Sequence, residues 1–76
     1  MPIMFGMDET VMLTVNGETR NFAAPLTVAA LLMAIGLDTR KVAVEHNEAI
    51  VPRSRYTETR LVAGDQLEIV HFIGGG

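Results

Sequence analysis

The sequence predicts an α+β domain in which a mixed sheet of four to five strands carries one main helix across one face. Three observations lead to this fold class. Alternating apolar residues flank an Asn-Gly pair early in the chain, which is the pattern of a β-hairpin. A single apolar stripe with helical spacing follows. Short apolar runs separated by turn residues complete the chain, and a helix laid on a sheet buries the apolar face of both.

The hairpin is predicted over residues 11–23. Residues 11–15, Val-Met-Leu-Thr-Val, place their valines and leucine on one face of a strand. Asn16-Gly17 is the strongest two-residue hairpin signal, because both residues tolerate positive φ angles. Residues 19–23 then return as the second strand, and Phe22 is expected to face inward.

The helix is predicted to begin after Thr27, a residue type that caps the first turn of a helix. Its apolar stripe has the spacing i, i+3, i+4, i+7 and consists of Val28, Leu31, Leu32 and Ile35. Gly36 stands where a left-handed residue ends a helix, and Leu37 is expected to fold back onto the last turn. A helix this short must be held by packing on the sheet.

The second half of the chain is predicted to contain three more strands. A polar link over residues 38–41 leads into strands at 42–45 and 49–51, joined by a turn that contains His46, to which we assign no role. Residues 53–60 are expected to form an irregular turn with Tyr56 anchored against the core. Its arginines could meet an acidic partner or a phosphate, and the alternative is a solvated loop.

The last strand is predicted over residues 66–72, after a turn at Gly64. We expect it to be central, beside the first strand, with Leu67 and Ile69 facing the helix. Val70 and Phe72 would then form an apolar pair on the other face, where a partner protein could bind. The alternative is that this pair only completes a half-covered sheet, since isolated exposed apolar residues are normal.

The chain ends in Gly74-Gly75-Gly76, which cannot add to a core because glycine has no side chain. Residues 71–76, fully stretched, would reach roughly 20 Å, enough to enter a narrow active site on another protein. Such a tail presents the α-carboxylate of Gly76, an unreactive group that becomes an electrophile once ATP adenylates it. The alternative is an ordinary frayed terminus.

Composition limits the function classes. The 76 residues predict a loose extension at 1–9, a domain at 10–73 and a flexible tail at 74–76. With no cysteine there is no disulfide or thiolate metal site, and we expect no metal site at all. A net charge of −3 argues against a nucleic-acid partner. No apolar run reaches a membrane span, and the start lacks a basic signal segment, so a cytoplasmic protein with no membrane partner is expected.

The chain resembles the ThiS family of sulfur carriers, which belong to the β-grasp, or ubiquitin-like, superfamily. The resemblance runs from about Val11 to the end. Its best-matching segments are Val-Asn-Gly-Glu at 15–18, Ile-Val-Pro-Arg at 50–53 and Gly-Asp-Gln-Leu-Glu-Ile-Val-His-Phe-Ile-Gly-Gly-Gly at 64–76. The terminal glycines mark the whole superfamily, whereas Glu-Ile-Val-His-Phe-Ile before them points to ThiS. Residues before Thr10 fall outside the resemblance.

The resemblance implies a carrier without catalytic residues or a bound cofactor. A ThiF-like, E1-like adenylyltransferase would adenylate Gly76 with ATP, and sulfur from a cysteine desulfurase would convert the carboxylate into a thiocarboxylate. A ThiG-like thiazole synthase would then accept the sulfur in thiamine (thiazole) biosynthesis. Gly74 and Gly75 would thread the partner active sites, and Val70, Phe72 and Ile73 would be docking contacts.

Three alternatives remain open from the sequence. A sister sulfur carrier for molybdopterin or cysteine synthesis would use the same tail chemistry with another acceptor enzyme. A ubiquitin-like protein modifier would instead be conjugated to lysines through Gly76. A plain interaction module would not use the tail at all. The state of the Gly76 carboxylate after incubation with the activating enzyme separates these classes.

Overall fold

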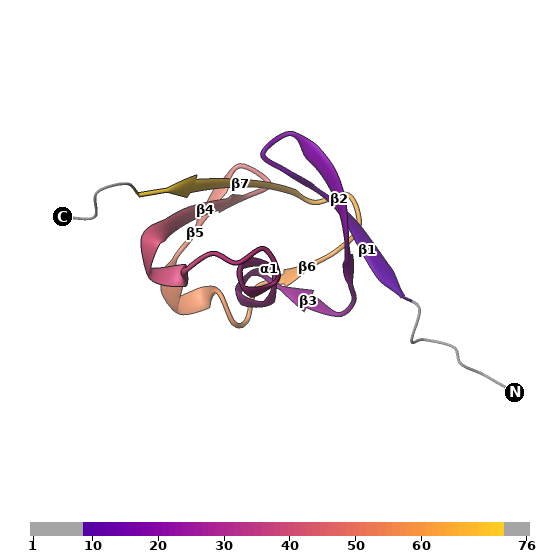
Figure 1. Cartoon of the computed structure of the whole chain (residues 1–76), viewed down its shortest axis with the longest axis horizontal. Helices are drawn as coiled ribbons and strands as arrows, with labels where there is room; N and C mark the ends of the chain where they lie inside the picture. Colours follow the sequence, from indigo (N-terminus) through magenta and orange to yellow (C-terminus); the bar gives the residue numbers. More distant parts are fainter. Residues whose placement is uncertain (1–8, 73–76) are drawn as a thin grey trace, which may run out of the picture.

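The computed structural model describes residues 9–72, and its main feature is a five-stranded mixed sheet with the strand order β2-β1-β7-β4-β5. The strands are β1 (Thr10–Val15), β2 (Glu18–Ala23), β4 (Val42–His46), β5 (Ala49–Val51) and β7 (Gln66–His71). Helix α1 (Val28–Ala34) packs across one face of this sheet (Figure 1). The predicted fold class is therefore confirmed, including the central place of the last strand beside the first.

The hairpin β1–β2 forms as the alternation predicts. The strands pair antiparallel from Thr10 opposite Ala23 to Val15 opposite Glu18. The turn residues Asn16 and Gly17 have φ angles of 50° and 84°, which is the left-handed geometry that the Asn-Gly pair favours. The hairpin thus brings one buried face of β1 over the helix and leaves the other face of the strand exposed.

Helix α1 begins and ends at the residues that the sequence indicates. The Thr27 hydroxyl accepts a hydrogen bond from the Ala30 N–H at 3.1 Å, which caps the first turn. Gly36 has a φ of 80°, and the Leu37 N–H returns to the Leu32 carbonyl at 2.9 Å. This closure is a Schellman motif, and it brings the half-buried Leu37 against the core.

The core lies between α1 and the sheet. Its buried side chains come from every main strand except β2 and are Val11, Leu13, Val15, Leu26, Val28, Leu31, Leu32, Val42, Val44, Val51, Tyr56, Leu61, Leu67 and Ile69. Phe22 of β2 packs against this core from the side, half-buried. Tyr56 is anchored as expected, because its ring is buried and its hydroxyl donates to the Val42 carbonyl at 3.4 Å.

Two 3-10 turns and a small second sheet were not predicted from the sequence. The polar link at 38–41 contains the 3-10 turn η1 (Thr39–Lys41), and the loop after β5 begins with a second one, η2 (Arg53–Arg55). In addition, β3 (Leu26–Thr27) and β6 (Arg60–Leu61) pair antiparallel as a separate two-stranded sheet. Elements of two or three residues leave too few positions for a periodic signal, so sequence patterning does not reveal them.

Candidate functional site

The candidate site is the end of β7, from which the glycine tail continues. β7 lies between two strands: it runs parallel to β1 and antiparallel to β4. Pairing with β4 extends to His71 opposite Val42, and the Phe72 N–H donates to the Lys41 carbonyl at 2.8 Å. The last described residue is thus still hydrogen-bonded to the body of the domain. The predicted site residues Ile73, Gly74, Gly75 and Gly76 lie outside the described residues.

The Asn16 side chain extends the pairing of β7 on its β1 edge. Backbone pairing with β1 covers Gln66 and Leu67. Beyond it, the Asn16 side-chain oxygen accepts the Ile69 N–H at 2.7 Å, and its amide nitrogen donates to the Ile69 carbonyl at 3.1 Å. The side-chain amide therefore acts as one more peptide group of the neighbouring strand. The sequence revealed Asn16 as a turn residue only, because this contact joins residues far apart in the chain.

The outer face of β7 carries the apolar pair that the alternation predicts. Leu67 and Ile69 are buried beneath the sheet, whereas Val70 is 58% exposed and Phe72 is 48% exposed. The exposed Ile50 of the edge strand β5 belongs to the same face, since its pairing partner Glu45 lies opposite Glu68 of β7. The geometry makes Val70 and Phe72 available to a partner. Their role in docking stays a prediction.

A polar cluster holds the opposite, starting end of β7. The Asp65 carboxylate accepts hydrogen bonds from the Val62 N–H at 2.9 Å and the Asn47 amide at 3.1 Å, and it lies 2.7 Å from His46 Nε2. Asn47 also accepts the Gln66 N–H at 2.8 Å. The turns before β5 and before β7 are thereby joined. His46, which the sequence left without a role, is a structural partner of Asp65.

The surroundings of Asp65 also determine its protonation. Burial alone would raise the pKa of this carboxyl, because it disfavours the charged form. Hydrogen bonds from the Val62 backbone and from the side chains of His46 and Asn47 outweigh the burial and hold the pKa below the ordinary value of 3.8. The carboxylate is therefore ionised at neutral pH and serves as the acceptor on which the cluster is built.

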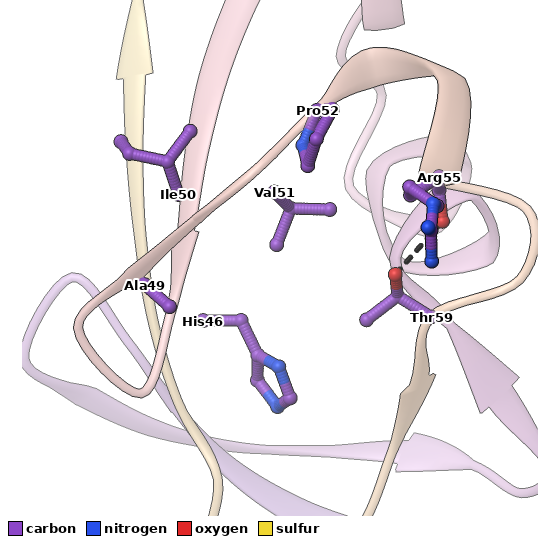
Figure 2. A pocket seen from close by; sticks show the side chains of 7 residues that line it. All are labelled: His46, Ala49, Ile50, Val51, Pro52, Arg55 and Thr59. Atoms are coloured by element: carbon purple, nitrogen blue, oxygen red, sulfur yellow. Dashed lines mark hydrogen bonds between the residues drawn. The ribbon is translucent and has the colours of Figure 1, made fainter.

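A surface hollow lies beneath the edge strand β5, away from β7. It encloses about 350 Å³ and is lined by His46, Ala49, Ile50, Val51, Pro52, Arg55 and Thr59. Figure 2 shows His46 on one side of the hollow and Arg55 with Thr59 on the other, where the Thr59 hydroxyl donates to the Arg55 carbonyl at 2.8 Å. No residue of β7 lines it, so it is separate from the candidate site.

The described part of the chain, residues 9–72, contains no group of three His, Cys, Asp or Glu residues that could hold a metal ion. Within the same residues, no helix is long and apolar enough to cross a membrane.

Comparison with known proteins identifies the family. The model of the ThiS family matches residues 13–76, which is most of the chain. The chain belongs to the ThiS family. This family comprises sulfur carrier proteins of thiamine biosynthesis, so the resemblance stated from the sequence is confirmed. A sulfur carrier of this family is a non-enzymatic carrier protein.

Individual ThiS relatives agree with this assignment. The sulfur carrier protein ThiS of Bacillus subtilis is 39% identical over 66 residues, covering 86% of this chain and 100% of that protein. The crystal structure of the thiamine biosynthesis protein ThiS from Geobacter metallireducens superposes with a TM-score of 0.74 at 33% identity, covering 87% of this chain and 100% of that chain. The β-grasp fold is therefore shown.

A second group of relatives carries a ThiS-like segment within a longer chain. A thiazole synthase from Paramagnetospirillum magneticum is 59% identical over 64 residues, and the match covers 84% of this chain but 20% of that protein. A thiazole synthase from Magnetococcus marinus is 51% identical over 61 residues, which is 19% of its length. This chain thus spans about a fifth of the length of these two thiazole synthases.

Proposed function

We propose that this ThiS-family chain carries sulfur as a thiocarboxylate on Gly76 and delivers it to a thiazole synthase. The observation that carries the proposal is the construction of β7. The strand is central and paired on both edges, and its exposed end leads directly into the glycine segment. A rigid base followed by residues without side chains suits a tail that must enter an enzyme active site.

The proposed reaction begins at a ThiF-like, E1-like adenylyltransferase. The Gly76 carboxylate attacks the α-phosphorus of ATP, pyrophosphate leaves, and the acyl-adenylate is formed. The terminal sulfur of a cysteine desulfurase persulfide then attacks the acyl carbon and AMP leaves. Because that sulfur is still bonded to a second sulfur, a thiol must cleave the S–S bond and supply two electrons, which leaves the thiocarboxylate.

The chain's own residues contribute binding and presentation. Val70 and Phe72 are exposed beside the tail, and with Ile73 they would contact the partner enzymes, while Gly74 and Gly75 would pass through the narrow entrance of the active site. The chain binds no cofactor in this scheme, and ATP belongs to the adenylating enzyme. The relatives in which a ThiS-like segment is part of a thiazole synthase support that enzyme as the acceptor. In a biosynthetic role of this kind we expect the protein to act in the cytoplasm.

Intact mass measurement tests the proposal. The chain is incubated with ATP, a ThiF-like enzyme, a cysteine desulfurase and cysteine, and the expected result is a mass gain equal to one oxygen-for-sulfur exchange. Omission of ATP is the first control. Deletion of residues 75–76 is the second: it should abolish the mass gain and leave the melting temperature unchanged, because those glycines contribute no core area.

Three outcomes contradict the proposal, the third of them only in its choice of acceptor enzyme. High-mass conjugates that contain lysine isopeptide bonds would assign the chain to the protein modifiers. An unchanged mass with an active enzyme system would assign it to the plain interaction modules. Transfer of sulfur to a molybdopterin or cysteine synthesis enzyme, and not to thiazole synthase, would keep the carrier chemistry but change the pathway.

A further inference from the structure

The cations of this chain are concentrated near the end of β7. The whole chain has a net charge of −3 and contains six Lys and Arg residues. All but Arg20 lie between residues 40 and 60. Figure 1 shows the 3-10 turns η1 and η2, which carry most of them, at the end of the molecule where β7 ends. The acidic chain therefore has one locally basic end, and that end holds the candidate site.

Three of these residues belong to the two turns that lie next to the end of β7. The Phe72 N–H donates to the Lys41 carbonyl at 2.8 Å, so the backbone of Lys41 directly contacts the root of the tail. The Arg53 guanidinium donates to the Arg40 carbonyl at 3.3 Å, which holds η2 against η1. We refer to Arg40, Lys41 and Arg53 as the basic collar.

The collar is held in place by contacts within the domain. Arg40 forms a two-pronged pair with Asp38, with donor–acceptor distances of 3.1 Å and 3.0 Å, and this pair braces η1. Tyr56, directly after η2, is buried and bonded to Val42 at the start of β4. Lys41 and Arg53 are thus exposed cations, and each lies in a short 3-10 turn that is held by contacts within the domain.

Within residues 9–72, the carboxylates leave most of this charge free. Asp38 pairs with Arg40 and also lies within electrostatic reach of Lys41, but the ion pairs found in the described part of the chain include neither Lys41 nor Arg53. Arg53 uses one N–H on the Arg40 carbonyl, and a guanidinium has five donors in a planar fork that fits a carboxylate. A carboxylate from another molecule could form an ion pair with either side chain.

The position of the collar favours a carboxylate of the partner protein, and not a phosphate of the nucleotide, as the group that it binds. Gly76 lies four residues beyond Phe72, and an extended tail would carry its carboxylate roughly 13 Å away. That is farther than a lysine or arginine side chain reaches, so an adenylate on Gly76 would lie beyond the collar. The rim of a tunnel that holds the extended tail would instead lie against Phe72, and therefore against Lys41.

We propose that the basic collar docks against carboxylates at the rim of the tail-binding tunnel of the ThiF-like adenylating enzyme. This inference rests on the proposed function, in which that enzyme is the first to take the tail. A local basic patch can bind an acidic surface although the whole chain is acidic. At physiological salt the Debye length is about 8 Å, so acidic groups at the other end of the domain act weakly at the collar. The collar thus orients the carrier with its tail toward the tunnel, which raises the association rate.

Association kinetics test the collar against a matched charge change elsewhere. Lys41→Glu and Arg53→Glu are each compared with Arg20→Glu, which alters the net charge equally but lies on β2, where Arg20 stacks over Phe22 at 5.5 Å. At low salt we expect each collar variant to bind the ThiF-like enzyme roughly tenfold more slowly than the wild type. Arg20→Glu should bind at nearly the wild-type rate, and high salt should remove the differences.

Several results would contradict the proposed role of the collar. One is equal slowing by Arg20→Glu, which would reduce the effect to net charge; another is an unchanged rate in both collar variants at low salt. A loss seen only with thiazole synthase would assign the collar to the acceptor instead. If the melting temperature of a glutamate variant falls, the neutral variant Lys41→Gln or Arg53→Gln replaces it. We expect the neutral variants to slow association less than the glutamate variants do, but still to slow it. If the wild type gains no sulfur in the mass experiment, the proposed function is wrong. If it gains sulfur but the collar variants associate at the wild-type rate, only the proposal about the collar is wrong.

Discussion

The two ends of β7 are held in different ways. At its start, the Asp65 cluster and backbone pairing with β1 and β4 fix the strand on both edges. At its end, pairing continues on the β4 edge up to Phe72, whereas on the β1 edge it ends, within residues 9–72, at the hydrogen bond from the Ile69 N–H to the Asn16 side chain. The difference indicates a division of labour: stability is concentrated at the start and under the sheet, and binding groups are placed at the end.

The largest expected effect comes from the buried part of the strand. Leu67→Ala should lower the free energy of unfolding by about 3 kcal/mol, because Leu67 is 1% exposed and its removal leaves a cavity under α1. Val70→Ala, three residues along the same strand but exposed, should cost less than about 0.5 kcal/mol. Urea denaturation of both variants measures the contrast, and equal losses would refute the division between the two faces.

The next effect concerns the polar cluster. Asp65→Asn should cost about 2 kcal/mol at neutral pH, because one carboxylate oxygen that accepts from His46 and Val62 is lost as a charged acceptor. The loss should also depend on pH. The folded pKa of Asp65 is lowered, so its contribution is complete above the ordinary value of 3.8 and disappears as the pH falls through the folded pKa.

Acid titration of stability isolates this contribution. The difference between wild type and Asp65→Asn should shrink below pH 3.8. Asp38→Asn is the matched control, because the Arg40 side chain lowers the pKa of Asp38 to about 2 while that carboxyl remains on the surface. Its removal should change stability little at neutral pH. A pH-independent gap for Asp65→Asn would show that hydrogen-bond geometry, and not charge, carries the effect.

A smaller effect is expected at Asn16. Asn16→Gly keeps the positive φ that the turn requires but removes the side-chain amide, so it should cost about 1 kcal/mol. Hydrogen exchange gives the sharper readout. The Ile69 N–H, which loses its acceptor, should exchange faster, and the Phe72 N–H, bonded to the Lys41 carbonyl, should not change relative to the global stability. Equal acceleration at both amides would mean that Asn16 acts only through the turn.

The smallest effect on stability is expected at Phe72. Phe72→Ala removes a side chain that is 48% exposed, so the melting temperature should hardly move. Binding to the adenylating enzyme should nevertheless weaken on the order of tenfold, as for an aromatic contact in an interface. Calorimetric titration with the purified enzyme measures it. Unchanged affinity would remove Phe72 from the docking residues.

Patterns local in the sequence predicted most of the fold. The Asn16-Gly17 turn, the Thr27 cap and the Gly36 terminus all depend on neighbours a few residues away, and each is confirmed. The central place of β7 beside β1 was also expected, and the strand order confirms it. Strand ends differed by a residue in several places, since fraying and pairing at the ends are decided by the partner strand.

Contacts between distant residues could not be predicted. Asp65 looked like a turn residue, and only the folded chain brings it to His46 and Val62. The basic collar was equally hidden, because Lys41 and Arg53 belong to separate turns that are joined by the hydrogen bond from the Arg53 side chain to the Arg40 carbonyl. Of the candidate site, the exposure of Val70 and Phe72 was predictable from strand alternation, whereas the roles of these residues and of the glycines remain proposals.

The antiparallel pairing of β7 with β4 has a mechanical consequence. In the proposed carrier cycle the tail would leave each enzyme after it has reacted, and a pull on the tail in line with the strand would act along the axis of β7. The hydrogen bonds to β4 lie across this direction, so they resist the pull together in shear and do not open one after another like a zipper. We therefore expect the last strand to stay paired with β4 when the tail is pulled along this axis.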